Sequence, residues 1–230
     1  MYYKVLFMTS QHQSLDTLQD IKRMMERSSR FISLSGWSGV SAGCCALIGA
    51  WLAHEKLQQM FGGPVGRDWN YAVRGHQSIP DQIASFYDLI LIGICTFVAA
   101  LISSFFFTWL RSRKQKTPLW DRTVQRLMWN TALPLGIGGL VILRCLQLGY
   151  FEMVAPGCLI FYGLALVNAS KYTLGEIRYM GYGQLILGVI NLWNVGSGLL
   201  LWAIGFGVLH IVYGLVMWWK YERISQQSNS

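Results

Sequence analysis

The chain alternates between long apolar stretches and short polar or basic ones. Six stretches are almost free of charged residues, and they cover residues 31–53, 86–110, 127–146, 151–169, 179–193 and 199–219. A helix needs roughly 20 mostly apolar residues to cross the hydrocarbon core of a bilayer. The pattern therefore predicts an all-α, polytopic membrane bundle of about six transmembrane helices, which form one membrane domain over residues 31–220.

Three parts of the chain differ from a full-length apolar stretch. The stretch 179–193 is short, so it is either a full crossing or a re-entrant or tilted segment. Residues 54–85 are polar and contain several Gly and Pro residues as well as Asn70, which predicts a loop. Residues 221–230 are polar, and we expect a disordered tail. Six spans suggest the three-plus-three inverted repeat of many transporters, but the two halves share no motif.

Residues 14–30 form the one clearly amphipathic segment, in a cytoplasmic N-terminal segment 1–30. Ser14 is suited to be its N-cap, and Asp16 lies in the first turn, where the helix dipole favours an acid. Leu, Ile and Met fall near one face, while Lys and Arg flank or oppose it. Three uses of this face remain open: lying at the membrane interface, packing on the bundle, and binding a cytoplasmic protein partner. Met8 opens an ordinary polar N-terminus, and we expect translation to begin there rather than at Met1.

Charge then sets the expected orientation. The net charge is +8, and the basic residues are unevenly placed. Fifteen Lys and Arg lie in the segments that six crossings would put on one side, against three in the loop 54–85 on the other. Basic residues are retained on the cytoplasmic side, so we expect an inner-membrane protein with both termini in the cytoplasm. Contact with the lipid bilayer accounts for this charge, and no direct nucleic-acid binding is expected.

Small residues recur along the first apolar stretch. Ser35, Gly39 and Gly43 are spaced every four residues, which places them in one stripe on a helix. Such a stripe lets two membrane helices approach closely. Packing inside the chain is the favoured interpretation, and a homo-oligomer is the alternative.

Polar residues in the apolar stretches mark the places where chemistry could occur, because such groups are costly in hydrocarbon. Asp88, Arg144 and Glu152 are expected at one depth, just below the outer surface. We expect a structural ion pair between Arg144 and one of the acids. Separate snorkelling to the headgroups and a ligand site open to the outside are the alternatives.

His210 is expected near mid-depth in the last stretch. Asn168, Gln184, Asn191 and Asn194 are candidate hydrogen-bond partners, and Asn191 fits best by depth. A neutral histidine bonded across helices is favoured over a proton relay or a metal ligand. The sequence contains no catalytic motif and no closed zinc pattern, so we expect no catalytic, metal or cofactor-binding residues, and not an enzyme. The five cysteines lie in or beside apolar stretches and are interpreted as small hydrophobic residues.

The junction between the amphipathic segment and the first apolar stretch carries a resemblance. It reads MERSSRFISLSG from Met25 to Gly36 and continues into Gly39-Val40 and the run 46–50, ALIGA. Over residues 20–52 the chain resembles a family of uncharacterised bacterial six-span integral membrane proteins. Members start close to the amphipathic helix and often sit beside small winged-helix regulators. The resemblance implies a non-catalytic membrane sensor or accessory partner of a cytoplasmic regulator. A small-molecule or ion transporter or channel is the alternative.

Overall fold

The computed structural model describes residues 35–61, 79–115 and 122–223, and its elements there are all helical, which confirms the all-α prediction for this part of the chain. The main helices are α2 (Gly36–Phe61), α4 (Ile79–Gln115), α5 (Arg122–Gln147), α6 (Val154–Ala169), α7 (Ile177–Trp193), α8 (Gly198–Trp202) and α9 (His210–Met217). A 3-10 turn, Phe151–Met153, precedes α6, and another, Val195–Ser197, precedes α8. Helices α8 and α9 belong to one continuous rod, Gly198–Arg223, here called the C-terminal helix. Its segments Ala203–Leu209 and Trp218–Arg223 are π-helical.

Five of these helices are long and apolar enough to cross a membrane. They are Gly36–Gln59, Tyr87–Arg113, Arg122–Gln147, Phe151–Ala169 and Gly198–Lys220. Helix α7 has 17 residues. At 1.5 Å per residue it is about 26 Å long, somewhat less than the roughly 30 Å hydrocarbon core.

The helices extend beyond the predicted spans. Helix α2 continues to Phe61 and α4 begins at Ile79, so the prediction of a loop over all of 54–85 is wrong at both ends. Polar residues can continue a helix once its apolar part has formed and packed. The polar composition of residues 54–85 therefore does not show where the helices end. The C-terminal helix similarly continues to Arg223, into the predicted tail. The amphipathic segment 14–30 lies outside the described residues.

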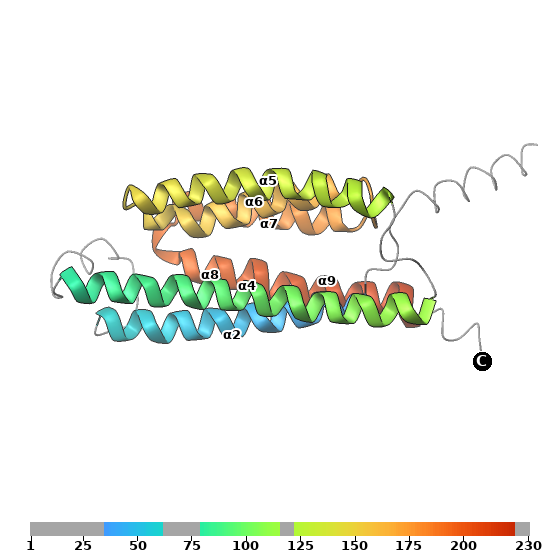
Figure 1. Cartoon of the computed structure of the whole chain (residues 1–230), viewed down its shortest axis with the longest axis horizontal. Helices are drawn as coiled ribbons and strands as arrows, with labels where there is room; N and C mark the ends of the chain where they lie inside the picture. Colours follow the sequence, from blue (N-terminus) through green and yellow to red (C-terminus); the bar gives the residue numbers. More distant parts are fainter. Residues whose placement is uncertain (1–34, 62–78, 116–121, 224–230) are drawn as a thin grey trace, which may run out of the picture.

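The helices form two layers (Figure 1). In one layer, α2 packs against both α4 and the C-terminal helix. In the other, α6 packs between α5 and α7. The first half of the C-terminal helix also contacts α6 and α7, so this helix joins the two layers.

Glycines allow α2 and the C-terminal helix to approach closely. A Cβ on Gly214 would lie 2.6 Å from the carbonyl oxygen of Gly36 and 2.7 Å from the nitrogen of Val40. A Cβ on Gly43 would lie 2.7 Å from the carbonyl oxygen of Gly207. Helix association in membranes depends on such close contact, because lipid tails are as apolar as the side chains. The small-residue stripe of Gly39 and Gly43, with buried Ser35 at its start, therefore faces the C-terminal helix of the same chain.

A proline links α5 to α6. Helix α5 continues through Pro134, whose nitrogen carries no hydrogen for the carbonyl of Asn130 four residues earlier. The side-chain amide of Asn168 on α6 donates a hydrogen bond to this carbonyl oxygen at 2.8 Å. The Asn130 carbonyl, which has no N–H partner within α5, thus helps to fix the position of α6 against α5.

The two ends of the bundle differ in charge. The end of α4, the start of α5 and the end of the C-terminal helix lie at the same end of the molecule (Figure 1). We call it the basic end, and it carries Arg111, Arg113, Arg122, Arg126 and Lys220. The opposite end carries the Phe61 end of α2 and the Gln147 end of α5.

Candidate functional site

The candidate site is a row of polar groups between α7 and the antiparallel C-terminal helix, here called the polar seam. At the basic end, the Lys220 ammonium lies 2.5 Å from the Glu176 carboxylate. In the middle, the Gln184 amide donates to the carbonyl oxygen of Gly205 at 2.8 Å. Near the opposite end, the side-chain oxygen of Asn191 lies 3.9 Å from where a Cβ on Gly198 would be. Polar groups thus occur at three levels along one helix pair.

The middle level is a hydrogen-bond network around the π-helical segment. The carbonyl oxygen of Gly205 accepts from Gln184 and is also 3.1 Å from Nδ1 of His210. Because a carbonyl can only accept, Nδ1 must carry the proton in this contact. Nε2 of a neutral His210 is then an acceptor, and it lies 2.8 Å from the Tyr162 hydroxyl of α6, which donates. The π-helical segment Ala203–Leu209 carries the shared carbonyl, and π-bulges occur frequently at functional sites.

Aromatic rings pack beside this network. The ring of Phe206 is stacked on that of His210, with centroids 5.9 Å apart and 15° between the planes. It also lies 5.0 Å from the rings of Tyr162 and Trp202. His210 is therefore held by two hydrogen bonds and a ring stack, and it is 7% exposed. These contacts fix the orientation of the His210 ring and use both of its nitrogens, so the side chain is not arranged as a free base.

Two side chains of the polar seam are not fully paired. Gln184 is 0% exposed, and its Oε1 has no hydrogen-bond partner within the described part of the chain. Asn191 is 1% exposed, and there neither its Oδ1 nor its Nδ2 has a partner. A buried polar atom without a hydrogen bond costs about 1–3 kcal/mol. Asn191 thus has an unused acceptor and an unused donor at one level of the polar seam, and Gln184 has an unused acceptor about two turns away on α7.

The predicted ion pair of Arg144 with Asp88 or Glu152 is wrong. Asp88 pairs with Lys56 of α2 at 2.6 Å, because α2 and α4 are neighbours in one layer. Arg144 lies in the other layer and donates to Gln147 at 3.2 Å, one turn further along α5. Asp88 is kept from Arg144 and Glu152 because sharing a depth does not make two helices adjacent. Glu152 lies in the 3-10 turn that contacts α5, yet within the described part of the chain it forms no ion pair with Arg144.

The predicted pairing of His210 with Asn191 is also wrong. The antiparallel register sets Gln184 opposite Gly205 and leaves Asn191 about two turns away. Tyr162 was missed, because a tyrosine in an apolar stretch gives no sign of which helix it will face. Among the described residues, no group of three or more His, Cys, Asp or Glu side chains is placed to hold a metal ion.

Comparison with protein-family models, curated proteins and solved structures finds no match. The resemblance over residues 20–52 therefore stays a prediction.

Proposed function

We propose that the protein is a non-catalytic membrane sensor or accessory protein, in which the polar seam responds to a small polar ligand and a cytoplasmic regulator receives the signal. The observation that carries this proposal is the buried, unpaired amide of Asn191. An unpaired amide in the interior lowers stability without contributing to packing. Polar groups inside membrane bundles are otherwise rare and tend to be functional.

The proposal includes a placement in the membrane. All six long helices cross the inner membrane: α2, α4, α5, α6, α7 and the C-terminal helix. Helix α7 is a short crossing held between α6 and the C-terminal helix. The basic end is cytoplasmic, because Lys and Arg are retained there. Asn191 then lies close to the outer surface, and the Glu176–Lys220 pair lies at the cytoplasmic surface.

The C-terminal helix runs from the level of Asn191 to the level of the Glu176–Lys220 pair, so a movement at one level can be transmitted to the other. A ligand bonded to Asn191 lies against the start of the C-terminal helix at Gly198, and a shift of this helix moves Gly205 relative to Gln184 and Lys220 relative to Glu176. At the basic end the ring of Trp218 lies 6.2 Å from that of Trp37, near the start of α2. The predicted partner-binding segment 14–30 directly precedes this point in the chain.

Substitution of Asn191 tests the proposal. Asn191→Leu removes the amide at similar volume, so we expect an unchanged or higher Tm in detergent together with altered recovery of a cytoplasmic partner from membranes. Asn194→Leu is the matched control, because Asn194 is exposed and bonded to its own helix. Deletion of residues 14–30 should abolish recovery of the partner. Equal recovery from wild type, Asn191→Leu and the deletion variant would contradict the proposal.

A carrier or channel is the second candidate, and the three polar levels across the bundle favour it. Reconstituted liposomes distinguish the two functions. Flux of urea or glycerol above that of empty liposomes, abolished by Asn191→Leu and retained in Asn194→Leu, would establish transport. A sensor should leave the flux at the level of empty liposomes.

A further inference from the structure

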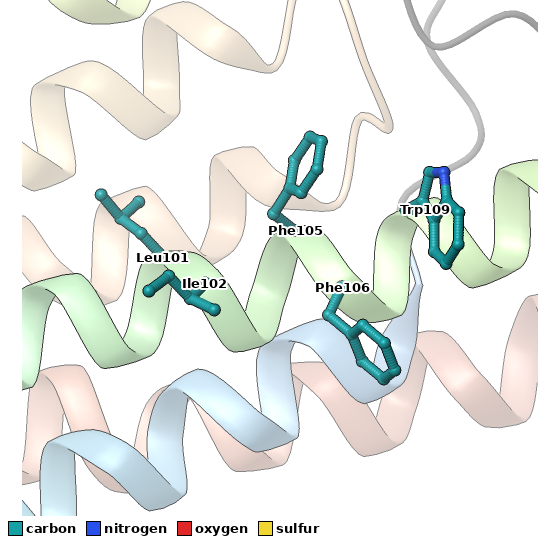
Figure 2. Close-up of a pocket in the computed structure, with 5 residues that line it drawn as sticks. All are labelled: Leu101, Ile102, Phe105, Phe106 and Trp109. Atoms are coloured by element: carbon teal, nitrogen blue, oxygen red, sulfur yellow. The ribbon is translucent and has the colours of Figure 1, made fainter.

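Helix α4 carries an apolar groove that the polar seam does not use. The groove has a volume of about 430 Å³ and is lined by Leu101, Ile102, Phe105, Phe106 and Trp109 (Figure 2). Leu101, Ile102, Phe105 and Phe106 are each more than half exposed. Figure 2 shows Phe105 projecting from one side of the helix and Phe106 from the other. The lining is a shallow, hydrocarbon-like surface.

The groove ends at positive charge. The guanidinium of Arg113 lies 4.7 Å from the centroid of the Trp109 ring, and its side chain is exposed. Arg111 is two residues closer to the groove, and Arg122 and Arg126 begin α5 at the same end of the molecule (Figure 1). The apolar groove and the positively charged side chains of Arg111 and Arg113 therefore lie next to each other on α4.

The dimensions match one leaflet of a bilayer. Leu101 and Trp109 are eight residues apart, or about 12 Å along a helix. One leaflet contributes about 15 Å of the hydrocarbon core. Trp prefers the headgroup level, and Lys and Arg beside it attract anionic lipids. With Trp109 at that level, the groove lies beside the acyl chains and Arg113 beside the phosphates.

We propose that this part of α4 binds one anionic phospholipid, with an acyl chain along Leu101–Trp109 and its phosphate group on Arg113. The stacked Trp109 ring holds the guanidinium of Arg113 at the end of the groove. Arg111 adds positive charge, which favours a net negative headgroup over a zwitterionic one. This inference is independent of the function proposed for the polar seam.

The test uses the full chain purified in a neutral detergent, with phosphatidylglycerol and phosphatidylcholine added in parallel. Bound lipid is counted by native mass spectrometry, and Tm is followed by thermal unfolding. We expect phosphatidylglycerol to bind more tightly and to raise Tm more. Arg113→Gln should weaken phosphatidylglycerol binding about fivefold, since one basic residue near the headgroups contributes about 1 kcal/mol. Arg113→Lys should retain most of the binding.

Arg144→Gln is the matched control, because Arg144 is also an exposed arginine near a helix end but lies at the opposite end of the bundle. It should bind phosphatidylglycerol as the wild type does. Phe105→Ala should weaken binding of both lipids. Inorganic phosphate and glycerol 3-phosphate should not reproduce the rise in Tm. Equal binding of the two lipids, equal losses in Arg113→Gln and Arg144→Gln, or full stabilisation by glycerol 3-phosphate alone would overturn the proposal.

Discussion

Single backbone carbonyls carry much of the specificity inside this bundle. The carbonyl of Asn130 is left over by Pro134 and accepts from Asn168, and the carbonyl of Gly205 accepts from two side chains. In hydrocarbon such groups have no water to bond, so each must find a partner within the protein. Side chains that supply these partners fix the neighbouring helices in one register.

The Asn168 contact can be measured by a double-mutant cycle. Asn168→Leu should lower the free energy of unfolding by roughly 1–3 kcal/mol, because the carbonyl of Asn130 loses its donor. In a Pro134→Ala background the new backbone N–H supplies a donor within α5, so the same substitution should cost clearly less. Unfolding in mixed detergent gives both values. Equal losses in the two backgrounds would show that Pro134 and Asn168 are not coupled.

At the residue scale, the sequence allowed prediction of which polar residues lie in costly places but not of their partners. His210 and Asn191 stand out because they are polar in apolar stretches, and both are indeed buried. Their partners depend on the register between two helices, which no local pattern sets. The pairing of Asp88 with Lys56 was missed for the same reason, because the packing of α2 against α4 is set by tertiary structure and not by a local sequence pattern.

At the scale of elements, close packing by glycine distinguishes positions that look alike in the sequence. A Cβ on Gly214 would meet the backbone of α2, whereas one on Gly139 of α5 would meet nothing within 4 Å. Ala is favoured over Gly in a helix by about 1 kcal/mol. We therefore expect Gly139→Ala to be neutral or stabilising, and Gly214→Ala to be destabilising by about 1–3 kcal/mol, because the backbone of α2 must move. Tm in detergent checks both, and similar shifts would contradict close packing of α2 on the C-terminal helix.

The helices themselves were predictable because a run of roughly 20 apolar residues leaves few other structures in a membrane. The predicted stretch 127–146 differs from α5 by a few residues, and 151–169 coincides with the 3-10 turn and α6. The π-helical segment Ala203–Leu209, whose Gly205 carbonyl is shared by Gln184 and His210, was not predicted from its apolar sequence. Helix ends beyond the hydrocarbon were also missed, as at Phe61 and Ile79.

At the scale of the whole molecule, the layers do not follow chain order. One layer contains α2, α4 and the C-terminal helix, and the other contains α5, α6 and α7 (Figure 1). A three-plus-three repeat would instead divide the chain after α5. The C-terminal helix packs against α2 and completes its layer, so the first and last described helices lie together. The polar seam forms where the C-terminal helix meets α7 of the other layer.

The number of crossings decides whether the polar seam can connect the two sides of the membrane, and cysteine labelling measures it. Lys171 follows α6 and Asn194 follows α7, and both are exposed. If α7 crosses, Lys171→Cys should react with an impermeant maleimide from one side of the membrane only and Asn194→Cys from the other side only; in the proposed orientation the Lys171 side is the cytoplasm. The five native cysteines are replaced beforehand, since Cys44 and Cys95 are exposed on their helices. Labelling of both positions from the same side would make α7 re-entrant, leave five crossings, and separate Asn191 from the outer surface.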